Sequence, residues 1–241
     1  MAKNIQLLVI DPQNDFCNTQ GSLYVKGADQ DMERLAKMIH NNKKKIDDIR
    51  VTLDSHRLLH IAHPIWWSDV NGNEPAPFTQ ITEQDVDAGV WKARNPAFQK
   101  RTVAYVKQLA ANKKYPLYIW PPHCLIGSWG YGVYPVLFEA IQAWEKQFAA
   151  VDYVVKGSNM FTEHYSVVKA DVTDPEDPTT LINTDFIQRL QKADLILVAG
   201  EALSHCLCNS VKDIMTEFGS EQARKFVILE DATSPLLDLK V

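Results

Sequence analysis

Residues 195–215 read LILVAGEALSHCLCNSVKDIM, an apolar run followed by a turn and an amphipathic segment. Its apolar start, residues 195–199, is typical of a buried strand, and residues 207–218 predict a helix. A turn connects the two, and Cys206 lies where the helix begins. The stretch therefore predicts a strand, a turn and a helix, which is the repeating unit of an α/β protein.

The same alternation recurs along the rest of the chain. Further apolar runs predict strands at residues 5–10, 49–53, 117–120, 153–156 and 226–229. Helices are expected near residues 29–45, 97–112, 135–148 and 184–192. Continuous runs of Val, Ile and Leu suit a sheet that is covered on both faces. We therefore expect a doubly wound α/β fold, with a mainly parallel sheet between two layers of helices.

Bulk properties narrow the functional classes. A chain of 241 residues has room for one well-buried domain, which we place at residues 1–241. Its net charge of −5 offers no general basis for binding nucleic acid or an anionic membrane. The first apolar run is too short for a signal sequence, and four cysteines do not suggest a disulfide framework. We expect a cytoplasmic protein that acts on a small molecule.

The least regular stretch covers residues 64–96. Its Pro, Gly and Asn residues favour loops, whereas Trp66, Trp67 and Phe78 are too apolar to be left in water. We expect a packed insertion or lid near the pocket mouth. A subunit interface in a homo-oligomer is the alternative that the sequence leaves open.

Reactive side chains follow several of the predicted strands. A thiol at a helix N-terminus, as Cys206 is placed, meets unpaired N–H groups that lower its pKa and can hold an oxyanion. The plainer alternative is that Cys206 and Cys208 are small buried hydrophobes. Asp11 directly follows the first strand and is placed to act as a base, whereas Asp15 could equally cap a turn. Lys156 ends another apolar strand, where its ammonium would stabilise nearby negative charges.

A second group of residues has the chemistry of a metal site. Asp54 and His56 stand two apart at a strand end, so both side chains can point the same way, and His123 follows another strand. One carboxylate and two imidazoles suit zinc, manganese or iron. His60 or His63 is the candidate for a fourth ligand, and surface histidines remain the alternative for both.

Eight short motifs in this order resemble the nicotinamidase/isochorismatase superfamily of cysteine hydrolases, and the nicotinamidase (pyrazinamidase) branch in particular. They are IDPQNDF at 10–16, GSL at 21–23, LDSH at 53–56, WPPHC at 120–124, GS at 127–128, KG at 156–157, GEALSHC at 200–206 and EDAT at 230–233. One such motif would be weak evidence. Eight in family order over nearly the whole chain are strong evidence.

The resemblance implies roles for individual residues. The family's triad falls on Asp11 as base, Lys156 as the supporting charge and Cys206 as nucleophile. Its metal ligands fall on Asp54, His56 and His123, with His60 as the best match for a further histidine. The oxyanion hole would use the backbone amides of Ala202 and Cys206, after a cis peptide bond between Glu201 and Ala202. Phe16 and Trp120 match the aromatics that hold the substrate ring. The family fold has about six parallel strands.

The implied reaction is hydrolysis of a small carboxamide, such as nicotinamide, through a thioester acyl-enzyme with one divalent ion, most simply zinc. The departures concern the substrate: the family's GVATDYC-like run reads GEALSHC here, and Trp66 and Trp67 have no counterparts. Hydrolysis of a carbamoyl or ureido group is therefore the alternative. Isochorismatase chemistry and a non-catalytic binding role are less expected, because the triad and the metal ligands are all present.

Overall fold

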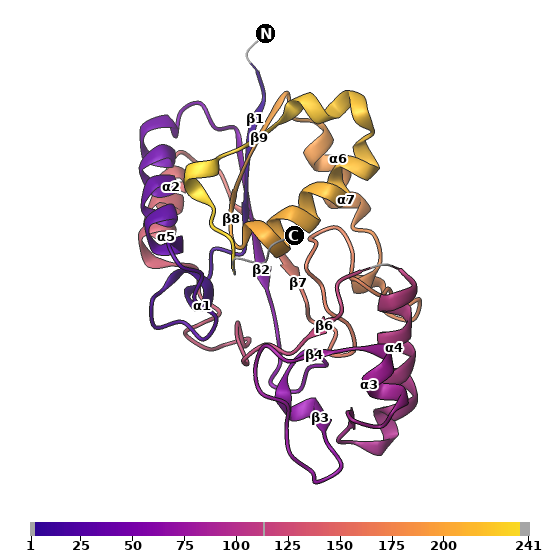
Figure 1. Cartoon of the computed structure of the whole chain (residues 1–241). Coiled ribbons are helices and arrows are strands. Elements are labelled where there is room, and N and C mark those ends of the chain that lie inside the picture. Colours follow the sequence, from indigo (N-terminus) through magenta and orange to yellow (C-terminus); the bar gives the residue numbers. More distant parts are fainter. Residues whose placement is uncertain (1–2, 113, 237–241) are drawn as a thin grey trace.

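A parallel sheet of five strands forms the centre of the protein (Figure 1). The computed structural model describes residues 3–112 and 114–236. The strand order is β7-β2-β1-β8-β9, and every neighbouring pair is parallel. The five strands are β1 (Ile5–Ile10), β2 (Asp48–Asp54), β7 (Asp152–Lys156), β8 (Leu195–Gly200) and β9 (Phe226–Ile228). The predicted doubly wound parallel sheet is confirmed.

The sheet has five strands rather than the six expected. The apolar run predicted at residues 117–120 forms only the short strand β6 (Leu117–Tyr118), which pairs antiparallel with β4 (Gln80–Ile81). Beyond it, the Ile119 amide donates to Thr79 at 2.9 Å and the Trp120 amide donates to Ala62 at 2.8 Å. The run thus satisfies its backbone with nearby loops, and an apolar pattern alone does not say which partner a strand will take.

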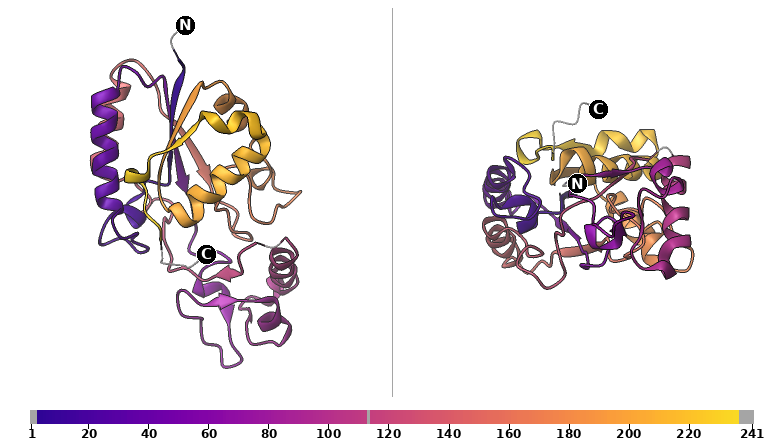
Figure 2. Two further views of the ribbon diagram at one scale, coloured as in Figure 1. Left: turned by 45° about the horizontal axis from the view of Figure 1, so that its top comes forward. Right: turned by 60° about the horizontal axis from the view of Figure 1, so that its bottom comes forward.

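Helices cover both faces of this sheet (Figure 2). On one side lie α2 (Ala28–Asn42) and α5 (Pro135–Glu145), and on the other lie α6 (Thr184–Gln191) and α7 (Cys208–Phe218). Successive side chains of a strand point to opposite faces. Leu7 and Val9 accordingly join the core under α2 and α5, whereas Leu8 and Ile10 join the core under α6 and α7. This two-sided burial explains the continuous apolar run of β1.

The remaining helices and strands lie near the carboxyl end of the sheet or beside it. They are α1 (Asn14–Cys17), β3 (Trp67–Ser68), α3 (Glu83–Asp87), β5 (Lys92–Ala93) and α4 (Gln99–Ala111). Thr82 and Asp85 form a capping box that satisfies backbone amides at the start of α3. None of the helices among residues 3–112 and 114–236 has the length and apolar character needed to cross a membrane.

The segment at residues 64–96 packs through its tryptophans. Trp66 stacks on Phe98, with ring centroids 5.0 Å apart, and donates its indole N–H to Thr102 of α4 at 3.1 Å. Trp67 is fully buried and donates to the Ile61 carbonyl at 2.6 Å. Only Phe78 approaches a predicted substrate residue, with its ring 6.0 Å from that of Trp120. The two tryptophans therefore anchor this segment to the body of the protein.

Candidate active site

The carboxyl ends of four strands bring the predicted triad together. Asp11 follows β1, Lys156 ends β7, and Cys206 lies in a π-helical turn (Leu203–Leu207) between β8 and α7. The Lys156 ammonium lies 2.8 Å from an Asp11 carboxylate oxygen and 3.6 Å from the Cys206 sulfur. It also lies 3.0 Å from Asp54, which ends β2. One buried cation thus contacts both carboxylates and the thiol.

Two glycines allow the chain to pass this closely. Gly200, at a φ of 105°, would place a side-chain carbon 2.0 Å from the Ile10 carbonyl oxygen. Gly157, at a φ of 80°, would place one 2.8 Å from the Asp54 carboxylate. Any larger residue at either position would separate the strand ends and be strained as well. These glycines therefore permit the approach of β1, β2, β7 and β8 at the site.

The charges at this point depend on one another. Burial alone would neutralise each group. Attraction to Asp11 and Asp54 outweighs burial and raises the pKa of Lys156, so the ammonium stays charged. His56 and Lys156 likewise outweigh burial and hold the pKa of Asp54 well below its usual range. At Asp11 burial prevails, and its pKa is raised despite Lys156. A carboxyl with a raised pKa is suited to exchange protons.

The thiol of Cys206 differs from the prediction. Its position before a helix led us to expect a lowered pKa, but burial raises the pKa of this thiol, and Lys156 offsets only part of that effect. Complete desolvation of a thiolate thus prevails over the nearby ammonium. The resting thiol therefore keeps its proton and depends on a base. Asp11 and this thiol contact the same Lys156 ammonium, which places Asp11 to serve as that base.

The other predicted acid, Asp15, has a structural role. Its carboxylate accepts hydrogen bonds from the backbone amides of Cys124 at 2.7 Å and Ser22 at 3.0 Å. It therefore holds the loop that carries His123, and the reading of Asp15 as a turn cap agrees with its contacts.

Four buried histidines and Asp54 form a cluster beside the triad. One donor atom each from Asp54, His56 and His123 lie within 4.8 Å of one another, and the same holds for His56, His60 and His63. His56 Nε2 is 2.9 Å and His123 Nε2 is 3.4 Å from the same oxygen of Asp54. His123 donates Nδ1–H to the Pro121 carbonyl at 2.8 Å, which leaves the Nε2 lone pair facing Asp54. This donor set fits a borderline divalent ion.

His60 and His63 differ in what their ring nitrogens do. His60 donates from Nε2 to the Thr162 carbonyl at 3.2 Å and accepts the Ala62 amide at Nδ1, so both nitrogens are engaged. His63 donates from Nδ1 to the Leu58 carbonyl at 3.0 Å, and its buried Nε2 has no partner among the described residues. Burial and the neighbouring histidines lower the pKa of His63 to about 3, so its ring is neutral. His63, rather than the expected His60, has a lone pair free for a ligand.

A cavity of about 20 Å³ lies against Cys206. Both predicted substrate residues, Phe16 and Trp120, line it, together with Asp54, His123 and Ala202. A cis peptide bond precedes Ala202, as the resemblance implies. The free space is little more than a water molecule needs, so the walls of this site lie close together.

Sequence reasoning missed three polar residues that line this cavity: Glu163, Tyr165 and His205. Glu163 is buried, and burial raises its pKa. The Tyr165 hydroxyl accepts the indole N–H of Trp120 at 3.1 Å, and the His205 ring lies edge-on to Trp120 at 5.5 Å. The sequence signal for Glu163 and Tyr165 was their position in the loop that follows Lys156, the last residue of β7. His205 directly precedes the predicted nucleophile.

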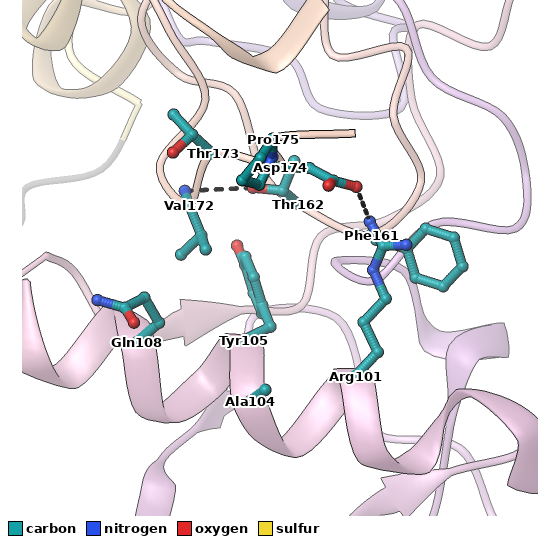
Figure 3. A pocket seen from close by; sticks show the side chains of 10 residues that line it. All are labelled: Arg101, Ala104, Tyr105, Gln108, Phe161, Thr162, Val172, Thr173, Asp174 and Pro175. Carbon is teal, nitrogen blue, oxygen red and sulfur yellow. Dashed lines mark hydrogen bonds and ion pairs between the residues drawn. The ribbon is translucent and has the colours of Figure 1, made fainter. Parts of the chain in front are cut away.

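A larger cavity, of about 220 Å³, lies between α4 and residues 161–175 (Figure 3). Its charged residues, Arg101 and Asp174, are paired with each other, and the Arg101 guanidinium lies 3.7 Å from the centre of the Phe161 ring. It contains none of the predicted site residues. The chemistry-bearing groups gather in the smaller cavity, which we therefore take as the candidate site.

Known proteins with this architecture cover nearly the whole chain. The nicotinamidase of Saccharomyces cerevisiae is 24% identical over 234 residues, which is 96% of this chain and 88% of that protein. Its solved structure superposes with a TM-score of 0.66 at 21% identity, over 98% of this chain and 90% of that one. The chain has the nicotinamidase fold. No family model matches it.

Two further structures extend the likeness to the nicotinamidases. A nicotinamidase/pyrazinamidase of Acinetobacter baumanii has a TM-score of 0.64 at 20% identity, over 99% of this chain and 87% of that one. A pyrazinamidase of Pyrococcus horikoshii in complex with zinc has a TM-score of 0.53 at 16% identity, over 98% and 88%. The predicted resemblance to the nicotinamidase branch is confirmed, and these relatives are by name amide hydrolases, the predicted class.

Proposed function

We propose that this protein is a metal-containing cysteine amidohydrolase that cleaves a small heteroaromatic carboxamide, such as nicotinamide, to the acid and ammonia. The observation that carries the proposal is the buried Lys156 ammonium in contact with Asp11, Asp54 and Cys206. A binding protein has no need for a buried thiol between an ammonium and a carboxyl. A nucleophile with an adjacent base and an orienting charge is the arrangement of covalent catalysis.

In the first half of the reaction Asp11 acts as general base. It accepts the Cys206 proton as the sulfur attacks the carboxamide carbon, and Lys156 stabilises the negative charge that remains at the site. The backbone amides of Ala202 and Cys206 hold the oxyanion. Asp11 then returns its proton to the amide nitrogen, the carbon–nitrogen bond breaks, and ammonia leaves a thioester on Cys206.

In the second half the thioester is hydrolysed. Asp11 accepts a proton from a water molecule as its oxygen attacks the thioester carbon, and the same two amides stabilise the second oxyanion. The carbon–sulfur bond breaks, the thiol regains its proton, and the carboxylic acid departs. A raised pKa at Asp11 suits both directions of proton transfer.

Asp54, His56, His123 and His63 would hold the metal, which we take to be zinc. When bound, such an ion supplies a Lewis-acidic contact for the ring nitrogen of the substrate. Two orphaned atoms support the assignment, because His56 Nδ1 and His63 Nε2 are buried without a partner among the described residues. Phe16 and Trp120 lie where they would enclose the ring, and their apolar surfaces exclude water from it.

The direct test is ammonia release from a panel of amides. We expect hydrolysis of nicotinamide and pyrazinamide and no comparable release from carbamoyl amino acids or ureido acids, which lack a ring nitrogen for the metal. The Cys208→Ala variant serves as a control for thiol specificity and should retain the activity. Release from the ureido acids alone would instead support the carbamoyl or ureido alternative.

The fourth metal ligand provides a second test. His63→Asn is expected to weaken zinc binding about a hundredfold or more, because it removes a free imidazole lone pair. This loss exceeds the usual effect of replacing a residue that only hydrogen-bonds to a metal ligand. His60→Asn should weaken it roughly tenfold or less, because both His60 nitrogens already bond to protein. Elemental analysis and competition with a chelator measure both. Loss of zinc in His60→Asn but not in His63→Asn would reverse the assignment.

A further inference from the structure

Residues 201–207, which connect β8 to α7 and carry Cys206, form the nucleophile turn. This turn contains a buried carboxyl that the proposed reaction does not use. Glu201 is fully buried and directly follows β8, in the run where the family pattern has an apolar residue. The backbone amide of Ser234 donates to Glu201 Oε2 at 3.1 Å, and the other oxygen of this carboxyl is buried without a hydrogen-bond partner among the described residues. Asp31 of α2, only 2% exposed, is the nearby carboxyl that raises the pKa of Glu201.

The charges in this cluster are balanced by a single arginine. Arg34 donates to Asp31, and the Ser234 hydroxyl donates to the other Asp31 oxygen at 2.6 Å. Burial and then Asp31 raise the pKa of Glu201 well above its usual range. A raised pKa favours the neutral form of this buried carboxyl, and its oxygen still accepts the Ser234 amide.

The segment at residues 231–236 is tied to the nucleophile turn at three points. Besides the Ser234 amide, the Ser234 carbonyl accepts the Leu203 amide at 2.9 Å, and the Leu236 amide donates to the Ser204 hydroxyl at 3.1 Å. Leu236 then lines the cavity beside Cys206. Residues 234–236, which lie outside any helix or strand, therefore supply one wall of the site.

We propose that Glu201 is a positioning residue that holds residues 234–236 against the nucleophile turn, so that Leu236 limits the size of the amide admitted to Cys206. This inference rests on the proposed function only in taking the substrate to be an amide. A wall beside a thiol limits the access of any electrophile to the sulfur. We therefore expect the site to admit amides with a single flat ring. A substrate with a second fused ring or a branched amide would collide with the Leu236 side chain.

Alkylation of Cys206 tests the wall without any amidase activity. In a Cys208→Ala background, the rate constants for iodoacetamide and for N-benzhydryl iodoacetamide are compared, because their ratio cancels the ionisation of the thiol. The ratio is the rate constant for iodoacetamide divided by that for the bulky reagent. We expect Leu236→Ala to lower this ratio roughly tenfold, the scale of size discrimination by an apolar pocket wall. Glu201→Ala should lower this ratio as much, whereas Glu201→Gln should preserve it, because the glutamine side-chain oxygen can still accept the Ser234 amide.

The outcomes separate the two proposals. A lowered ratio in Leu236→Ala and Glu201→Ala, with rescue by Glu201→Gln, supports the wall even if no amide is hydrolysed. An unchanged ratio in Leu236→Ala overturns it even if nicotinamide is a good substrate. A changed ratio in Leu236→Ala but not in Glu201→Ala overturns the role of Glu201. If Glu201→Ala does not fold, the near-isosteric Glu201→Met, which also lacks an acceptor for the Ser234 amide, takes its place, and an unchanged ratio in that variant overturns the role equally well.

Discussion

Replacing Cys206 with alanine is expected to reduce ammonia release below about a hundredth of the wild-type rate, because the sulfur is the atom that forms the bond to substrate. The substitution removes one buried atom and no charge, so the free energy of unfolding should change by only about 1 kcal/mol. Steady-state assays on nicotinamide, with thermal unfolding followed in parallel, measure both effects.

The neighbouring thiol is the matched control. Cys208 starts α7, is only half-buried and does not line the cavity, so Cys208→Ala should keep nearly full activity. Substantial activity in Cys206→Ala would remove this residue from the mechanism. A lethal Cys208→Ala beside an active Cys206→Ala would move the nucleophile by two positions.

Lys156→Met is expected to have the second large effect. A positive neighbour favours the thiolate, so its removal raises the pKa of Cys206 and moves the alkylation profile of this thiol to higher pH. Each unit of that rise lowers the thiolate fraction at a fixed lower pH about tenfold. The same change leaves Asp11 and Asp54 buried without their ammonium, and both carboxyls should bind protons more readily.

The measurement is the rate of iodoacetamide labelling across pH, together with kcat for nicotinamide. Lys156→Arg keeps the charge and should shift the profile much less than Lys156→Met does. Superimposable profiles for Lys156→Met and the wild type would show that the ammonium does not act on Cys206. Circular dichroism establishes whether each variant is folded before the comparison is made.

Much of the architecture could be read from the sequence. Apolar runs marked the five strands of the sheet, and in the central strand β1 the unbroken run reflects burial on both faces. The same reading placed Asp11, Asp54, Lys156 and Cys206 at or just beyond strand ends. Parallel strands end at one edge of the sheet, so their proximity followed from the fold class.

The tertiary structure decided what depends on partners distant in sequence. The run at residues 117–120 left the central sheet because its amides bond to Ala62 and Thr79. His63 rather than His60 has a free nitrogen because Leu58, Ala62 and Thr162 occupy the others. Individual hydrogen bonds between distant residues decide such details, and neither composition nor periodicity predicts them.

Electrostatics shows the same division between sequence and structure. The sequence by itself determined which ionisable groups the protein has and which strand ends carry them. Their pKa values depend on the tertiary structure, because burial raises the pKa of Cys206 in spite of Lys156, and burial together with Asp31 raises the pKa of Glu201. Desolvation is a property of everything packed around a group, and no local stretch of sequence contains it.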